Sequence, residues 1–140
     1  MCLTTKTKKV SIAEDDIVCY KVVMLCSDGE FGTPFQKAVI PNAIISGNSP
    51  FFASGDKEIT YWPIIDVYTV GQGYIHTYEK LVSAVRFCKS EVMWEGNISN
   101  ASYRIFECRI PKGTKYYAGC DDFYEPSFAS EKITFKTQIR

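Results

Sequence analysis

The sequence has no excess of charge of either sign, no long apolar run and only one histidine. Its sixteen basic and sixteen acidic residues give a formal net charge of zero. Nucleic-acid binding draws most of its affinity from lysine and arginine on phosphate, so a chain without net positive charge is not expected to bind nucleic acids. A helix that spans a bilayer needs about 20 consecutive apolar residues, and no segment approaches this length. We therefore expect neither a nucleic-acid partner nor a membrane partner.

A secretory signal is not predicted either, because residues 1–6 contain no apolar run. We expect a soluble, cytoplasmic protein, and in that reducing compartment its six cysteines should be free thiols. No C-x-x-C pair occurs, and a single histidine, His76, cannot complete a usual zinc site. The sequence therefore predicts no metal site and no cofactor.

What the chain does contain is enough apolar surface for a folded core. Apolar residues make up 46% of it and aromatic residues 14%, too many for a disordered polypeptide. We expect residues 1–140 to form a single domain, which is a usual size for one core. A basic cluster at Lys6, Lys8 and Lys9 lies near the N-terminus, and residues 1–11 are predicted to form a flexible arm.

The first half of the chain predicts a strand, a hairpin and a loop. Segment 17–26 is rich in β-branched and aromatic residues and is interrupted only by Lys21, which predicts a mostly buried strand. An Asp-Gly turn at 28–29 favours a hairpin, with 31–40 as the returning strand. Turn-forming residues predict a long, irregular loop over 41–63. Its aromatic residues are expected to fold onto the body of the protein, and a recognition surface is the alternative.

The second half predicts the main helix and the remaining strands. Apolar residues recur with a helical period from Tyr78 to Cys88, so an amphipathic helix is expected over about residues 78–89. Further strands are expected at 64–70, 103–110, 115–118 and 133–139. The sequence as a whole predicts an α+β fold. In it, one helix packs on a mostly antiparallel sheet of about six strands.

Four motifs carry a resemblance to a known group of proteins. They are IAEDDIVCYKV at 12–22, GYIHT at 73–77, FECRIPKGTKYY at 106–117 and FASEKI at 128–133. In these motifs the chain resembles small uncharacterised proteins encoded by gut anaerobic bacteria and their phages. This resemblance implies kinship and supplies no mechanism.

A more distant similarity is to ADP-ribosyltransferase folds. It consists of an early strand with Tyr20 and Lys21, a later helix, and Glu131 just before the last strand. In those enzymes a glutamate at this place orients the acceptor or the NAD ribose, so the similarity implies this role for Glu131. It places Tyr20 or Lys21 where the family has its NAD-binding arginine or histidine, with His76 nearby. The catalytic candidates are therefore Tyr20, His76 and Glu131.

Two functional hypotheses remain open from the sequence. The first is a noncatalytic binding or accessory module of a bacterial or phage protein, with an unidentified protein or small molecule as its partner. The aromatic-rich middle segment and the lack of a catalytic motif favour it. The alternative is a divergent ADP-ribosyltransferase-like enzyme that uses NAD, which predicts that Tyr20, His76 and Glu131 line one cleft. In that case His76 acts as an acid or base. The alternative for His76 is a purely structural role, as a hydrogen-bonding residue. Oligomeric state is left open.

Overall fold

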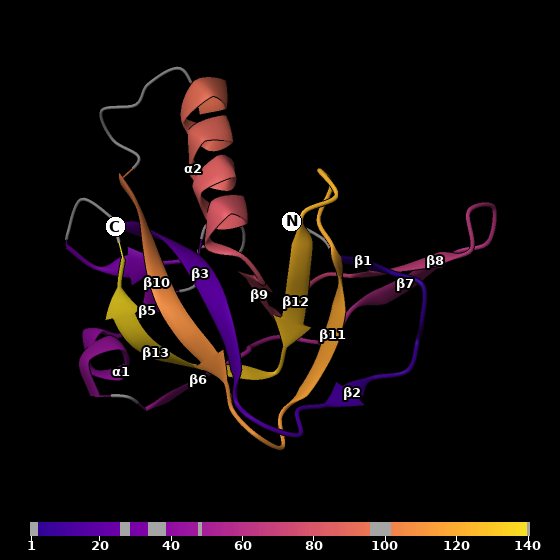
Figure 1. The fold of residues 1–140 in the computed structure, drawn as a ribbon, viewed down its shortest axis with the longest axis horizontal. Coiled ribbons are helices and arrows are strands. Elements are labelled where there is room, and N and C mark those ends of the chain that lie inside the picture. Colours follow the sequence, from indigo (N-terminus) through magenta and orange to yellow (C-terminus); the bar gives the residue numbers. More distant parts are fainter. Residues whose placement is uncertain (1–2, 26–28, 34–38, 48, 96–101, 140) are drawn as a thin grey trace.

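The fold is built around one curved antiparallel sheet (Figure 1). The computed structural model of the protein describes residues 3–25, 29–33, 39–47, 49–95 and 102–139. The first strands are β1 (Leu3–Thr5), β2 (Ser11–Ile12), β3 (Ile17–Leu25), β4 (Phe31–Gly32), β5 (Val39–Ile40), β6 (Pro50–Phe52) and β7 (Ile59–Trp62). The later strands are β8 (Val67–Val70), β9 (Ile75–Tyr78), β10 (Ser102–Ile110), β11 (Lys115–Cys120), β12 (Pro126–Ser130) and β13 (Lys132–Gln138). The helices are α1 (Asn42–Gly47) and α2 (Leu81–Glu95).

The α+β class predicted from the sequence is wrong. The described residues contain thirteen strands and two helices, one of only six residues, so the protein is a mostly antiparallel β fold. Only about six strands were expected, because many of the additional ones have two to four residues. Such short strands cannot show the alternation of apolar and polar residues that predicts a strand.

The predicted helix begins and ends later than expected. It was placed at about 78–89 and is found as α2, from Leu81 to Glu95. Tyr78 belongs instead to β9, where it pairs with Tyr20 of β3 and with Ser127 of β12. A buried aromatic residue fits the apolar face of a helix as well as it fits a buried strand. The helical spacing of apolar residues therefore included Tyr78, and the predicted start of the helix was too early.

Two segments predicted to lack regular structure contribute to the sheet. Residues 1–11, predicted to be a flexible arm, include β1, which lies between β11 and β8 with Leu3 only 1% exposed. Segment 41–63, predicted to be an irregular loop, holds α1, β6 and β7. The returning strand predicted at 31–40 is present in part, as β4 paired with β3 and β5. Residues 26–28 and 34–38 lie outside the described part of the chain.

The sheet curves strongly where β12 meets β13. Its strand order is β6-β13-β10-β3-β9-β12-β11-β1-β8-β7. Glu131 alone joins β12 to β13, yet β9, β3 and β10 lie between these two strands. One residue spans at most about 3.6 Å, so the sheet has to bend until the end of β12 reaches the start of β13.

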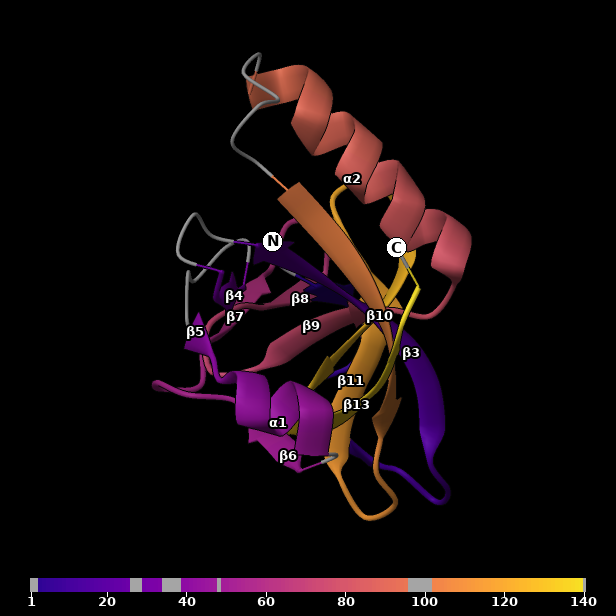
Figure 2. The ribbon, with the colours of Figure 1, turned by 90° about the vertical axis from the view of Figure 1, so that its left-hand side faces the viewer.

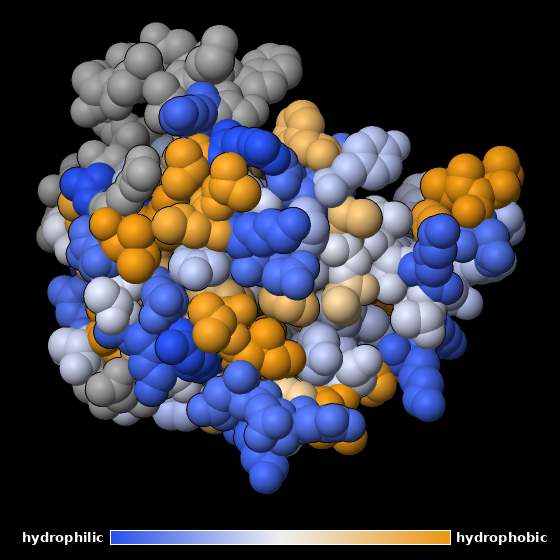
Figure 3. Space-filling model, viewed as in Figure 1, coloured by the Kyte–Doolittle hydropathy of each residue, from blue (hydrophilic) through white to orange (hydrophobic). Residues whose placement is uncertain are grey.

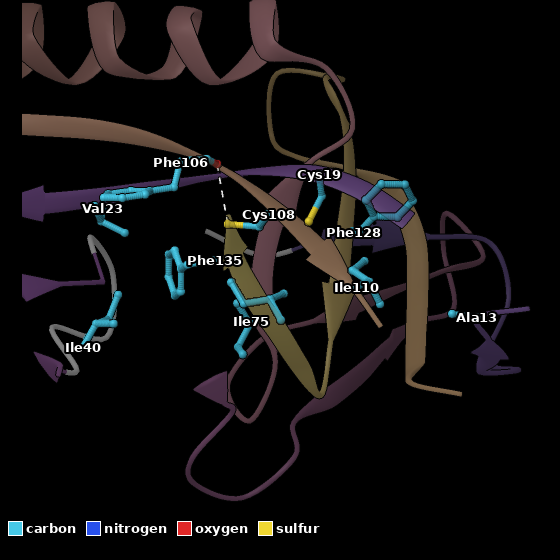
Figure 4. Packing of buried hydrophobic residues seen from close by; sticks show 11 residues of the cluster. Ala13, Cys19, Val23, Ile40, Ile75, Phe106, Cys108, Ile110, Phe128 and Phe135 are labelled. Atoms are coloured by element: carbon cyan, nitrogen blue, oxygen red, sulfur yellow. Dashed lines mark hydrogen bonds between the residues drawn. The ribbon is translucent and has the colours of Figure 1, made fainter. Parts of the chain in front are cut away.

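This bend encloses the main hydrophobic core (Figure 4). Phe128 of β12 and Ile133 of β13 both belong to it. At its centre, the Phe106 and Phe135 rings meet edge to face with their centroids 5.4 Å apart, a favourable arrangement for aromatic rings. The buried members of the cluster are Ala13, Cys19, Val23, Ile40, Ile75, Phe106, Cys108, Ile110, Phe128, Ile133 and Phe135.

Helix α2 covers part of the opposite face of the sheet (Figure 2). Ala84 and Phe87 of the helix pack there against Val22, Tyr78 and Ile105 of the strands. The sheet therefore has apolar residues on both of its faces at β3, β9 and β10. Neither helix in the described residues combines the length and the apolarity needed to cross a bilayer.

Polar contacts tie the start of α2 to the turn between β11 and β12. The Tyr78 hydroxyl donates to Oδ2 of the buried Asp121 at 2.8 Å. The other carboxylate oxygen of Asp121 accepts hydrogen bonds from two backbone amides of the turn. The Glu125 carboxylate accepts from Ser83 and from Arg86 of α2, each at 2.7 Å. Helix and turn are thus fixed to each other.

Replacing Tyr78 with phenylalanine should lower the free energy of unfolding by about 1 to 2 kcal/mol, because a buried carboxylate oxygen of Asp121 loses its donor. Urea denaturation measures this difference. Tyr124→Phe is the matched control, since Tyr124 is 88% exposed and its variant should match the wild type. Equal stability of Tyr78→Phe and the wild type would show that this hydrogen bond contributes nothing.

Candidate functional site

Strands β7 and β8 form a hairpin that projects from the rest of the molecule (Figure 1). Its strand residues are β-branched or aromatic, which suits a pleated pair that is only partly buried. Residues 63–66 make the turn, and Asp66 ends it with φ of 52°. Aspartate is one of the few residues that adopt this left-handed conformation readily. The local sequence therefore specifies the hairpin and its turn.

Side-chain contacts hold the two strands of the hairpin in one geometry. The Tyr61 hydroxyl donates to Oδ1 of Asp66 at 2.8 Å, and the Trp62 indole N–H donates to the Thr69 hydroxyl at 3.1 Å. The Tyr61 and Tyr68 rings pack with their centroids 4.8 Å apart. These contacts span the hairpin from its strands to its turn, so its tip is preorganised.

The tip presents apolar side chains to solvent. Ile64 is 99% exposed and Ile65 is 67% exposed, and the flanking Tyr61 and Trp62 are about half exposed. Figure 3 shows this hydrophobic surface at the projecting end of the hairpin, on the right of the view. A single exposed isoleucine is ordinary, but adjacent ones beside two aromatic rings form the kind of apolar patch that marks an interaction site.

The hairpin offers almost no charge to a ligand. Asp66 is the one charged residue from 59 to 70, and its carboxylate accepts the Tyr61 hydrogen bond. That bond raises the pKa of Tyr61 above its ordinary value. Recognition of phosphate or carboxylate relies on arginine or lysine, which the hairpin lacks. Its chemistry suits an apolar surface.

The chain matches no family model, no curated protein and no solved structure. The function of the hairpin is therefore inferred from its own geometry. These comparisons do not test the resemblance to small bacterial and phage proteins or the similarity to ADP-ribosyltransferase folds. Kinship with either group stays a prediction.

Two of the catalytic candidates lie on neighbouring strands. Tyr20 of β3 faces Tyr78 of β9, and His76 lies two residues before Tyr78 on the same face of the sheet. Tyr20 packs against the cluster beneath α2. The structure therefore makes Tyr20 and His76 diagonal neighbours.

His76 has a buried and neutral imidazole ring. Its Nε2 lies 3.0 Å from the carbonyl oxygen of Gly71, to which it donates. Burial lowers the pKa of His76 to about 4, since a charged ring would lose its hydration. Its Nδ1 is buried without a hydrogen-bond partner among the described residues. The ring thus stays neutral at physiological pH and uses its one N–H to hold the turn before β9.

Glu131 lies at the corner between β12 and β13, where it forms an ion pair with Lys57. The Lys57 ammonium also lies 5.7 Å from the centroid of the Tyr74 ring. Hydrogen bonding to Glu131 raises the pKa of Lys57, and both side chains are partly exposed. No local pattern indicates Lys57 as the partner of Glu131, because the two residues are 74 positions apart.

Lys21, the other residue to which the transferase similarity assigned a role, is buried beside the main core. Its ammonium donates to the carbonyl oxygen of His76 at 3.0 Å, and the residue is 6% exposed. Burial lowers the pKa of Lys21 to about 8 and raises the pKa of the neighbouring Cys19 thiol to about 12. Burial also raises the pKa of Cys108, which faces Cys19 across the strands. These three side chains lie inside the protein.

An open hollow of about 700 Å³ lies away from all these candidates. Its walls come from residues 7, 9–12 and 14–17 and from Tyr116. Acidic side chains at 14–16 line one part of it, and one of them, Asp16, accepts a hydrogen bond from the Lys112 amide. None of Tyr20, His76 and Glu131 lines this hollow.

Proposed function

We propose that this protein is a noncatalytic binding module that engages a protein partner through the tip of the β7–β8 hairpin. The observation that carries the proposal is the exposure of Ile64 and Ile65 on a hairpin that side-chain hydrogen bonds hold in place. The partner surface that fits this tip is an apolar pocket on another protein.

Preorganisation is the first support for this proposal. Binding by a flexible loop loses free energy to the ordering of its backbone and side chains. The contacts of Tyr61 with Asp66 and of Trp62 with Thr69 order the hairpin before any partner arrives. The free energy gained from burying the isoleucine side chains is then available for affinity.

Residue chemistry is the second support. Aromatic residues are enriched among the residues that dominate binding energy, and Tyr61 and Trp62 flank the apolar tip. The candidates for catalysis are placed differently. His76 is buried, and Glu131 is held by Lys57. The hairpin combines exposure, rigidity and apolar character in one element.

A double variant, Ile64→Ser with Ile65→Ser, should weaken partner binding about 100-fold or more. Burying an isoleucine side chain stabilises a complex by about 1.5 to 3 kcal/mol, so the loss of two such contacts corresponds to at least about 3 kcal/mol. Partners are first identified as proteins that the wild type enriches from lysate of the source cells and the double variant does not. Affinity is then measured by calorimetry with the purified partner.

Val39→Ser is the matched control, because Val39 is 57% exposed and lies in β5, outside the hairpin. Its affinity for the partner should equal that of the wild type. If the double variant binds the purified partner as tightly as the wild type does, the tip is not the binding surface.

A further inference from the structure

The two edges of the sheet are protected to different degrees. At one edge, β6 has three residues, begins with Pro50 and carries Phe52 beneath the Lys132 ammonium at 5.9 Å. A short edge strand with a proline is poorly suited to pairing with another strand. At the other edge, β7 reads Ile-Thr-Tyr-Trp, without a charge or a proline. Only β8 pairs with β7 in the described residues.

The unpaired backbone groups of β7 can be assigned to particular residues. Glu58, just before β7, accepts a hydrogen bond from the Gly71 amide and donates to Gln72, both on the β8 side. Backbone groups of alternate residues point to opposite sides of an antiparallel strand. Thr60 therefore bonds towards β8, and the amides and carbonyls of Ile59 and Tyr61 point to the open edge.

We propose that β7 is a self-association edge, where a second copy of this chain pairs antiparallel about a two-fold axis at Thr60. In this register Thr60 lies opposite Thr60 of the second copy, and Ile59 lies opposite Tyr61 of the second copy. Each of the two Ile59–Tyr61 pairs brings together residues whose free amides and carbonyls face each other. Opposed side chains also lie on the same face, as an antiparallel pair requires.

The side chains of β7 are complementary to themselves in this register. Threonine opposite threonine and an aromatic residue opposite a β-branched one are both favourable cross-strand pairs. The chain has no net charge, and β7 has none either, so the two copies do not repel each other. The hairpin projects from the body (Figure 1), and β7 is the last strand of the sheet on this side.

The contact between the two copies is short, so the dimer is expected to be weak and dependent on concentration. The inference does not rest on the proposed function of the tip, because it uses the backbone edge of β7 and not Ile64 or Ile65. Antiparallel pairing also places the two tips at opposite ends of the joined sheet. One dimer would then bind two partner molecules.

Sedimentation velocity of the purified chain, from about 10 μM to about 1 mM, tests the proposal. The wild type should shift from monomer to dimer over this range. Thr60→Lys and Thr60→Glu should each raise the dimer dissociation constant at least about tenfold, since like charges then lie directly opposite each other. An equimolar mixture of the two variants should restore a dimer, because the introduced lysine of one copy faces the introduced glutamate of the other.

The mixture makes this test specific for the register. Both variants change the same residue of the edge strand, and far-UV circular dichroism confirms that each is folded. A wild type that stays monomeric throughout the range overturns the proposal. So does a dimer that both variants preserve, or a mixture that shows no more association than either variant alone.

Discussion

Gly73→Ala is expected to lower the free energy of unfolding by about 3 kcal/mol. Gly73 has φ of +86°, a conformation that costs an alanine about 1 kcal/mol. A β-carbon built there would also lie 2.6 Å from the Lys57 Cα and 2.7 Å from the Asp56 carbonyl oxygen. These are backbone atoms that cannot rotate away, so the crowding adds about 2 kcal/mol. Urea denaturation of the two proteins measures the sum.

Gly113→Ala separates the two contributions. Gly113 has nearly the same φ, +85°, but a β-carbon there would have no atom within 4 Å. This variant should lose only about 1 kcal/mol, the conformational part. If both variants lose the same free energy, crowding at Gly73 is relieved by movement of the segment at the base of the hairpin. Crowding would then contribute nothing to the loss at Gly73.

The stability of the wild type relative to Lys21→Met should rise by about 3 kcal/mol from about pH 7 to about pH 11. The pKa of Lys21 is about 8 in the fold, against 10.5 as its ordinary value, because burial disfavours the charged ammonium. Between these two pH values the unfolded chain keeps a proton that the folded chain has released. Stability therefore increases with pH in this window, and the cost of the buried charge is fully present below about pH 8.

The comparison with Lys21→Met is needed because the adjacent thiols act in the opposite direction. Burial raises the pKa values of Cys19 and Cys108, so above their ordinary value of 9.0 the unfolded chain loses thiol protons first. The wild type alone would show the sum of both effects. Guanidinium denaturation of both proteins at several pH values gives the difference due to Lys21. If the free energies of unfolding of the wild type and of Lys21→Met change in parallel with pH, the Lys21 ammonium is hydrated and not buried.

The long strands could be predicted because their residues carry the pattern over many positions. Ile17–Leu25, Ser102–Ile110 and Lys132–Gln138 lie where β-branched or alternating residues predict them. Most of the short strands could not, since two to four residues fit a turn equally well. Strand β8 is an exception, because it lies within the strand expected at 64–70. The placement of β1 between β11 and β8 depends on pairing with residues far along the chain, which no local pattern records.

The candidate site could be predicted only in part. The sequence drew attention to Tyr61 and Trp62 as aromatic residues in a segment without a clear period, and left a recognition surface open as the alternative. It missed Ile64 and Ile65 because an apolar, β-branched pair before Val67 fits the beginning of a buried strand. Exposure of two isoleucines contradicts the usual tendency of this residue to be buried, and only the three-dimensional structure shows it.

The position of the last two strands bears on how the protein folds as it is made. Strands β12 and β13 fill interior places in the sheet, next to β9, β11, β10 and β6. A nascent chain that has not yet released residues 126–138 from the ribosome therefore lacks the strands that join β9 to β11 and β6 to β10. Contacts between residues so distant in sequence slow folding and leave apolar surface uncovered in the meantime. The main core is thus completed only when β12 and β13 add Phe128, Ile133 and Phe135 to it.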